Sequence, residues 1–325
     1  MVITLQPFAD IDAVRRALVA RGLWVSLVRS AQGAPSHFVV DPGSSPAEPS
    51  ELARIEGVAS VGAAPSPHPR VDAQGPVVDV RGLAVGGARP VFLCGPCGVE
   101  SEDQLQRIAA VVASAGAHFL RGGAFKPRTS PYAFQGHGSE ALRWLRRTAD
   151  RHGLRVVTEV LAEGDVPLVA EHADLMQVGS RNMQNFALLK AVGRAGRPVL
   201  LKRAMSATVA EWLLAGEYLL VHGAPGVVFC ERGIRSFDPS TRNLLDLGAV
   251  ALLSQVHRVP VVVDPSHATG RRELVGPLSK AALAAGAAGV MIECHDDPGG
   301  ALSDGPQALL PQQLRDVLAS LGGTV

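Results

Sequence analysis

Four side chains of the kind that bind metals stand at or just after short apolar runs in this sequence. They are Cys97, His267 in the segment VDPSHATG, Glu293 in MIECH, and Asp304 in ALSDG. One thiolate, one imidazole and two carboxylates suit a borderline divalent ion such as Mn2+, Fe2+, Co2+ or Zn2+. Singly, each has an ordinary explanation, because a lone cysteine is usually a small buried hydrophobe and a histidine can cap a turn. The four residues therefore predict a metal site only if the fold brings them together.

The pair Cys94-x-x-Cys97 has an alternative interpretation as a redox pair or as half of a zinc knuckle. No second CxxC occurs in the sequence. The pair also ends an apolar run, whereas thioredoxin-like motifs start a helix. The sequence therefore favours a metal-ligand role for Cys97.

Cations form the second set of candidate residues. The segment LRGGAFKPRTSPYAFQG, residues 120–136, sets Arg121, Lys126 and Arg128 among glycines and prolines. More cations end later apolar runs: Arg181, Lys202, Arg203 and Arg232. Arginine offers paired donors to phosphate oxygens, and lysine offers a point charge. Because a phosphate takes about two or three cations and an unfilled cluster repels itself, this set predicts two phosphorylated groups. For the segment 120–136 taken alone, the alternative is a solvated basic loop.

Glu159, in the segment VTEV, is a carboxylate placed among these cations. It is a candidate for orienting a lysine or for proton transfer. The alternative is a salt-bridge partner without a role in the chemistry.

The elements that would position these residues alternate in type from residue 89 onwards. Apolar runs of strand type occur at 91–93, 118–120, 155–158, 175–178, 199–201, 227–229, 261–263 and 290–292. Each is followed by a helix-compatible segment, which predicts a (β/α)8 TIM barrel. A doubly wound sheet is the alternative, but no GxGxxG follows the first run. In a closed barrel the first, seventh and eighth strands are neighbours, so the four metal-ligand candidates would converge.

The N-terminal part of the chain has a different pattern. Strand-like runs at 2–5, 23–28, 37–40 and 58–61 are interleaved with helical spacing at 11–21 and 50–55. This order predicts a small ferredoxin-like α+β domain, serving either packing and oligomerisation or ligand sensing. We therefore predict a ferredoxin-like domain over 1–65, a linker and barrel-capping hairpin over 66–88, and a catalytic barrel over 89–325.

Composition limits the class of protein. The 325 residues include 31 Lys plus Arg against 30 Asp plus Glu, so the net charge of +1 argues against a nucleic-acid binder. No apolar run reaches the roughly 18 residues of a membrane helix, and no secretory signal begins the sequence. Four cysteines in a chain of this length do not form a disulfide framework, so we expect a reducing cytoplasm.

Several segments together give the chain a family resemblance over about residues 94–310. They are GPCGVES, LRGGAFKPRTSPYAFQG, GSRNMQNFALLKAVG, VLLKRAMSATVAEW, CERGIRSFDPSTRN, VDPSHATGRREL and ALSDG. The sequence resembles 3-deoxy-D-arabino-heptulosonate 7-phosphate (DAHP) synthases of the type I-beta subfamily. The resemblance implies condensation of phosphoenolpyruvate with erythrose 4-phosphate, the entry step of the shikimate pathway to aromatic amino acids.

The resemblance also implies roles for single residues. Metal ligands would be Cys97, His267, Glu293 and Asp304, with Mn2+ the ion we favour. Phosphoenolpyruvate contacts would be Arg121, Lys126, Arg181, Lys202 and Arg232. Arg128 and Thr129 would hold the sugar phosphate. We take Lys126, Glu159 and Lys202 as candidate catalytic residues.

The resemblance further implies a homotetramer, and relatives have an N-terminal domain that binds tyrosine or phenylalanine as inhibitor. Here that domain resembles theirs in pattern only. The rival function is that of 3-deoxy-D-manno-octulosonate 8-phosphate synthase, which the arginine at position 128 disfavours. A more distant alternative is a catalytically silent barrel serving as a sensor or scaffold, but no metal or phosphate position is lost.

Overall fold

A computed structural model describes residues 1–28, 36–41, 43–62, 66–127 and 130–322. The chain divides into two compact units, Met1–Pro67 and His68–Val325. In the described residues, no helix is both long and apolar enough to cross a membrane. All four cysteines are buried and none forms a disulfide.

The first unit has the βαββαβ order of a ferredoxin-like fold. Its elements are β1 (Val2–Leu5), α1 (Ile11–Val19), β2 (Val25–Val28), β3 (His37–Val40), α2 (Pro49–Leu52) and β4 (Val58–Gly62). The strands form an antiparallel sheet in the order β2-β3-β1-β4. Ile3 and Leu5 alternate towards a core that they share with Val14 and Leu18 of α1. The α+β prediction for this part of the chain is confirmed.

The second unit begins with α3 (Pro69–Gln74), in a stretch that the sequence predicted to be a linker. That prediction is wrong for these residues. The Glu217 carboxylate of α8 (Val209–Val221) accepts hydrogen bonds from the backbone N–H groups of Arg70 and Val71 at 2.9–3.0 Å. The Gln74 amide forms hydrogen bonds with both the backbone N–H and the carbonyl oxygen of Val227, the first residue of β12 (Val227–Glu231). These distant partners stabilise a helix that local composition does not indicate.

A two-stranded hairpin, β5 (Val78–Val80) and β6 (Leu83–Val85), follows α3. Its buried valines pack in one cluster with Val91, Phe119 and Val157, which lie near the first residues of barrel strands. The hairpin therefore closes the N-terminal end of the barrel.

Eight parallel strands then close into a barrel in chain order, with the last strand paired to the first. They are β7 (Val91–Gly95), β8 (Phe119–Arg121), β9 (Arg155–Val160), β10 (Leu175–Val178), β11 (Val199–Lys202), β12 (Val227–Glu231), β13 (Val261–Val263) and β14 (Gly289–Glu293). Nearly every strand residue is buried, as expected where side chains alternate between a filled interior and a surrounding layer of helices. The predicted TIM barrel is confirmed.

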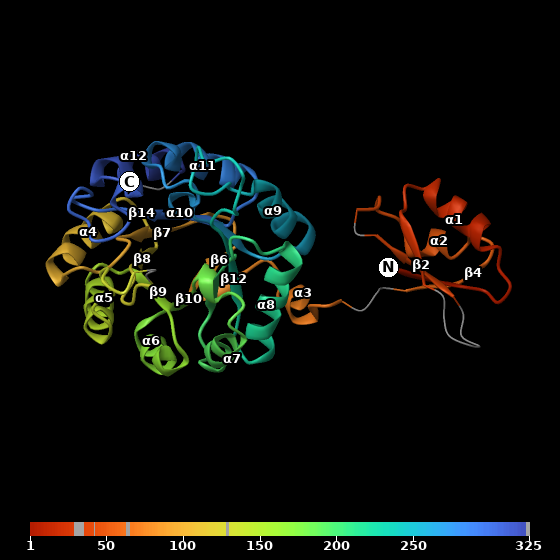
Figure 1. Cartoon of the computed structure of the whole chain (residues 1–325), viewed down its shortest axis with the longest axis horizontal. Helices are drawn as coiled ribbons and strands as arrows, with labels where there is room; N and C mark the ends of the chain where they lie inside the picture. The colour runs from red at the N-terminus through yellow and green to blue at the C-terminus, as the bar shows by residue number, and fades with distance from the viewer. Residues whose placement is uncertain (29–35, 42, 63–65, 128–129, 323–325) are drawn as a thin grey trace. The chain divides into compact units, whose positions relative to one another are not determined.

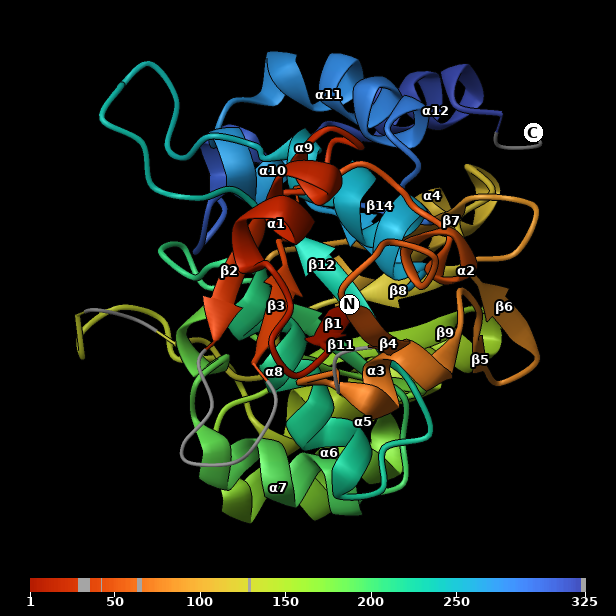
Figure 2. The same ribbon diagram turned by 90° about the vertical axis from the view of Figure 1, so that its right-hand side faces the viewer.

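Helices surround the barrel, as Figure 1 shows. The longer ones are α4 (Glu102–Ser114), α5 (Ser139–Arg151), α6 (Val166–His172), α7 (Phe186–Arg194), α8 (Val209–Val221), α11 (Arg272–Ala284) and α12 (Pro311–Ser320). Helix α8 begins with a capping box in which Thr208 and Glu211 each bond the other's backbone N–H. Helices α11 and α12 lie next to each other on the outside of the barrel (Figures 1 and 2).

Shorter helical segments stand at strand ends and complete the fold. They are α9 (Leu247–Ala251), continuing into the π-helix η3 (Leu252–His257), α10 (Pro265–Thr269), and the 3-10 helices η1 (Glu163–Asp165), η2 (Ser180–Asn182) and η4 (Gly305–Gln307). Helix α10 and the segment η4 directly follow candidate metal ligands or carry them, so they determine the geometry of the site.

Candidate functional site

The two-residue period of the strands places polar side chains at the C-terminal end of the barrel interior. Phe119 belongs to the apolar interior cluster, and Arg121 lies two residues later on the same side of β8. The same two-residue step leads from an interior hydrophobe to a polar residue at the C-terminal ends of six other strands. These polar residues are Glu159, Gln177, Lys202, Arg232, Asp264 and Glu293. The interior of the barrel therefore changes from apolar to charged over a single two-residue step along the strands. This change lies at the end of the barrel where TIM-barrel active sites lie.

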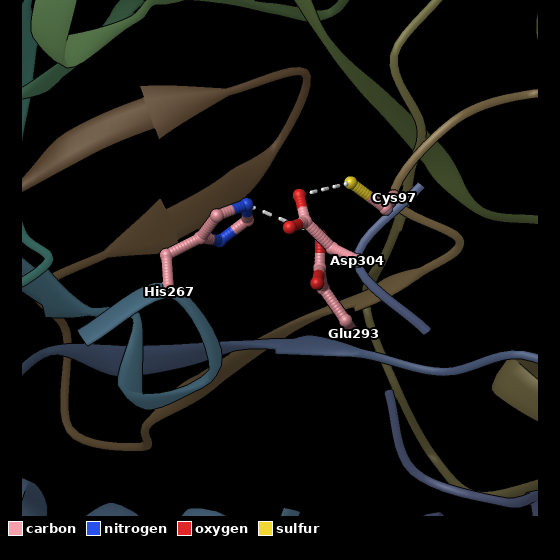
Figure 3. Close-up of side chains that lie close together, drawn as sticks. All are labelled: Cys97, His267, Glu293 and Asp304. Atoms are coloured by element: carbon pink, nitrogen blue, oxygen red, sulfur yellow. Dashed lines mark hydrogen bonds and ion pairs between the residues drawn. The ribbon is translucent and has the colours of Figure 1, made fainter. Parts of the chain in front are cut away.

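The four candidate metal ligands lie together at this end. Their ligand atoms all lie within 4.8 Å of one another. The Cys97 thiol donates to Oδ2 of Asp304 at 3.1 Å, and Nε2 of His267 lies 3.2 Å from Oε1 of Glu293. Figure 3 shows the four side chains pointing towards one another from different segments. The donor set of one sulfur, one nitrogen and carboxylate oxygens fits a borderline divalent ion.

Burial and neighbouring charges shift the protonation of this cluster. Burial raises the pKa of the Cys97 thiol to about 12. Burial also opposes ionisation of Glu293, but His267 and Arg121 hold the pKa of that carboxyl at about 2. Burial lowers the pKa of His267, which favours the neutral imidazole that binds metals. A metal ion that binds here would therefore find the neutral imidazole of His267 and the ionised carboxylate of Glu293. The thiol of Cys97 would have to release its proton before it could bind the ion.

Asp264 connects the cluster to the cations. It is fully buried at the start of α10, and its Oδ1 accepts the backbone N–H of His267 at 3.0 Å. Its Oδ2 lies 2.7 Å from Nδ1 of His267 and 2.6 Å from Nζ of Lys202. Burial opposes ionisation, but these contacts hold the pKa of Asp264 well below its ordinary value. The carboxylate thus orients the imidazole and stabilises a buried lysine.

A pocket of about 410 Å³ opens beside the cluster. Six cations line its described part: Arg121, Lys126, Arg181, Lys202, Arg232 and Arg242. Cys97, His267 and Asp304 line it too, so the cationic surface and the metal-ligand cluster share one space. Lys126 bridges the two, because its Nζ lies 2.9 Å from Sγ of Cys97 and 3.0 Å from its carbonyl oxygen.

Glu159 also lines this pocket, and its Oε2 accepts a hydrogen bond from the Gln177 amide at 3.2 Å. Gly179 leaves room for it, since a Cβ there would lie 1.9 Å from Oε1 of Glu159. Among the described residues no ion pair involves Glu159, so the salt-bridge alternative finds no partner.

Arg128 and Thr129, the residues predicted to bind the sugar phosphate, fall outside the described residues. The prediction that Arg203 is one of the phosphate-binding cations is wrong, because it follows Lys202 directly and the two-residue strand period turns its side chain away from the pocket. Arg203 is buried against Glu231 at 3.1 Å and Asp246 at 2.9 Å instead.

Arg242 is a residue of the site that no sequence pattern indicated. Its Nη1 lies 3.3 Å from both Oδ1 of Asp304 and Oε1 of Gln307, while the Gln307 amide donates to Oε2 of Glu293 at 2.5 Å. Arg242 thus contacts one candidate ligand directly and a second through Gln307. Arg242 lies in the long segment after β12. No sequence spacing in such a segment distinguishes an arginine that contacts the site from one that is exposed to solvent.

The fold and the site together define a class of protein: (β/α)8 barrels with a potential metal centre beside a pocket lined by cations. Within that class, the chain belongs to the DAHP synthetase I family, whose model matches residues 72–323.

The chain is also similar to individual proteins and structures of two names. A Thermotoga maritima protein named phospho-2-dehydro-3-deoxyheptonate aldolase is 46% identical over 253 residues, which cover 76% of this chain and 75% of that protein. A crystal structure of a DAHP synthase from the same organism matches 99% of this chain and 96% of its own, with a TM-score of 0.77 and 36% identity. A Methylibium petroleiphilum protein named 2-dehydro-3-deoxyphosphooctonate aldolase is 34% identical over 272 residues, 74% of this chain and 92% of that protein.

Proposed function

We propose that the chain catalyses the condensation of phosphoenolpyruvate with erythrose 4-phosphate to DAHP and inorganic phosphate, the first step of the shikimate pathway. The observation that carries this proposal is one pocket lined by six cations and open to a cluster of four metal-ligand side chains. That combination suits two phosphorylated substrates, one of which presents a carbonyl oxygen for a metal to polarise.

Phosphoenolpyruvate would occupy the inner part of the pocket. Its phosphate and carboxylate are matched by Arg121, Lys126, Arg181, Lys202 and Arg232. Arg121 and Lys202 are buried at the strand ends, held by Glu293 and Asp264 at 2.6 Å, so they meet the substrate already oriented. We propose that Arg128 and Thr129 bind the phosphate of erythrose 4-phosphate.

Cys97, His267, Glu293 and Asp304 would hold the divalent ion, for which we favour Mn2+ over Fe2+, Co2+ or Zn2+. The bound ion supplies Lewis-acid polarisation of the aldehyde of erythrose 4-phosphate. The fit rests on the donor types and on their mutual distances below 4.8 Å.

The chain's own residues would then position the reactants and move protons. Carbon 3 of phosphoenolpyruvate forms the new bond to the aldehyde carbon, and Lys126 donates a proton to the alkoxide that results. Water adds to the cationic carbon 2 and loses one proton, which leaves a hydroxyl on that carbon. The bond from carbon 2 to the phosphate oxygen then breaks with its electron pair leaving on phosphate, while the hydroxyl gives its proton to the phosphate and becomes the ketone carbonyl. Glu159 is the candidate acceptor for the proton of that water, and Lys202 stabilises negative charge on the departing phosphate.

The rival is condensation with arabinose 5-phosphate to an octulosonate phosphate. It is disfavoured by the lower identity to proteins of that name, 34% against 46%. Arg128 also favours the shorter aldose phosphate. A catalytically silent barrel is disfavoured because every proposed ligand and cation is present in the sequence.

A phosphate-release assay tests the proposal. Purified protein with Mn2+ and phosphoenolpyruvate should release phosphate when erythrose 4-phosphate is added, and release little without it. Release with arabinose 5-phosphate but not with erythrose 4-phosphate would transfer the assignment to the rival. No release with either aldehyde, from protein with a folded circular dichroism spectrum, would favour the silent barrel.

Four wider expectations belong to the same proposal. Residues 1–65 would form a regulatory domain that binds tyrosine or phenylalanine, and residues 89–325 would form the catalytic barrel. The enzyme would be a homotetramer and would work in the cytoplasm. Inhibition that survives deletion of residues 1–65 would exclude this regulatory role.

A further inference from the structure

A second group of metal-ligand side chains lies outside the pocket. His68 immediately precedes α3, Asp72 lies within α3, and His257 is the last residue of η3. One ligand atom from each lies within 4.8 Å of the other two. Helix α3 is bonded to Val227, the first residue of β12, so this group lies towards the N-terminal end of the barrel. The pocket lies at the opposite end, where the strands finish.

The three side chains face one another closely. Nδ1 of His68 lies 2.9 Å from Oδ1 of Asp72. The rings of His68 and His257 meet edge to face, with centroids 5.6 Å apart and planes at 68°. An ordinary helical pair at positions i and i+4 explains the contact of His68 with Asp72. It does not explain why a second imidazole, from a segment nearly two hundred residues away, approaches the same carboxylate.

Both supporting segments are held in place by contacts outside the group. Glu217 accepts hydrogen bonds from the first turn of α3. Gln74, the last residue of α3, bonds to the first residue of β12. On the other side, η3 is a π-helix, a rare form often found at functional sites. The next residue, Arg258, is left-handed with a φ of 52°, an uncommon conformation for a side chain of this size. The backbone therefore holds His257 at a fixed position against α3.

The group is buried on one side and open on the other. His68 is 8% exposed. The side chain of Asp72 is 42% exposed, which leaves a path for an ion from solvent.

We propose that His68, Asp72 and His257 form a second metal site, one that takes a borderline divalent ion such as Zn2+. Two imidazole nitrogens and one carboxylate oxygen match the ligands that Zn2+ uses, and solvent completes a tetrahedral set. The site contains no sulfur, whereas the cluster at the other end of the barrel contains Cys97. The bound ion ties the first helix of the barrel unit to η3, so the site has a structural role.

Metal-binding stoichiometry in the full-length chain tests this proposal. After treatment with a chelator, the protein is dialysed against Zn2+ and its metal content is measured. We expect two equivalents per chain in the unchanged protein, one in Cys97→Ala, one in His257→Gln, and none in the double variant. His222→Gln, which changes a histidine at the end of α8, should still bind two.

Cobalt absorption identifies which site each variant has lost. Co2+ bound to a thiolate gives a near-ultraviolet charge-transfer band, which should persist in His257→Gln and disappear in Cys97→Ala. In the Cys97→Ala background, Zn2+ should raise the melting temperature, and adding His257→Gln or Asp72→Asn should abolish that rise. Equal zinc content in His257→Gln and unchanged protein would overturn the proposal. So would a melting temperature of Cys97→Ala that does not respond to Zn2+.

Discussion

Nδ1 of His267 lies 2.7 Å from Oδ2 of Asp264, which fixes the tautomer of the imidazole. A carboxylate can only accept, so Nδ1 carries the proton and Nε2 presents its lone pair. That lone pair is directed to the side where Glu293 lies 3.2 Å away. The same Asp264 oxygen accepts from Lys202, so one buried carboxylate orients both a candidate metal ligand and a substrate-binding cation.

Replacing Asp264 by asparagine should therefore weaken metal binding. The amide keeps the size of the side chain but can face His267 with its NH2 group, which no longer selects the tautomer. We expect the Kd for Mn2+ to rise about 10- to 100-fold, measured by calorimetry on the full chain. Asp316→Asn, an exposed change on α12, is the control and should leave the Kd unchanged. An unaltered Kd in Asp264→Asn would show that the contact does not orient the ligand.

Substitution of Gly179 by alanine should move Glu159 without unfolding the barrel. The new Cβ would lie 1.9 Å from Oε1 of Glu159, and the end of that side chain can rotate away. If Glu159 accepts a proton, kcat should fall about 100- to 10,000-fold in Glu159→Gln. The kcat of Gly179→Ala should also fall. The melting temperature should change little in either variant.

Gly164→Ala is the matched control for this experiment, because a Cβ there meets nothing within 4 Å. It should retain full activity. Full activity in Glu159→Gln would contradict the proton-transfer role, whatever Gly179→Ala does.

Arg242 should act on metal affinity as well as on substrate binding. Its contacts with Asp304 and Gln307 hold one candidate ligand directly and Glu293 indirectly. We expect Arg242→Gln to raise the Kd for Mn2+ about 10-fold, at the lower end of the range for residues that support metal ligands. Arg143→Gln, an exposed change on α5, should have no effect. A raised KM for phosphoenolpyruvate with an unchanged metal Kd would instead place Arg242 in substrate binding alone.

His118 should make stability depend on pH below neutrality. The backbone N–H of Phe92 donates to Nδ1 of His118 at 3.1 Å, a bond that requires an unprotonated Nδ1. Burial, and then Arg155, lower the pKa of His118 in the folded protein. The unfolded chain therefore binds a proton more readily. This contribution to the free energy of unfolding is complete above the ordinary pKa of about 6.5 and is lost as the pH falls through the lowered value.

Unfolding in urea at pH 8.0 and pH 5.5 checks this prediction. His118→Gln should lose less stability between the two pH values than the unchanged protein, while His152→Gln, a control at the end of α5, should lose as much. Equal pH dependence in all three proteins would exclude His118 as the source.

The strands and the candidate metal ligands could both be predicted from the sequence for one physical reason. Strands buried on both faces appear as continuous apolar runs, and the polar residues that follow them mark the end of the barrel where sites lie. All eight runs are strands, and the structure brings Cys97, His267, Glu293 and Asp304 together.

The order of helices and strands, the family resemblance and the residue types available for chemistry can all be predicted from the sequence. Which of these residues come into contact depends on how the chain folds. Arg203 is next to Lys202 in the chain but lies on the other side of β11. Helix α3 depends on Glu217, and Arg242 reaches Asp304 across the loops. Such contacts join residues that are distant along the chain, so no local pattern of composition or spacing reports them.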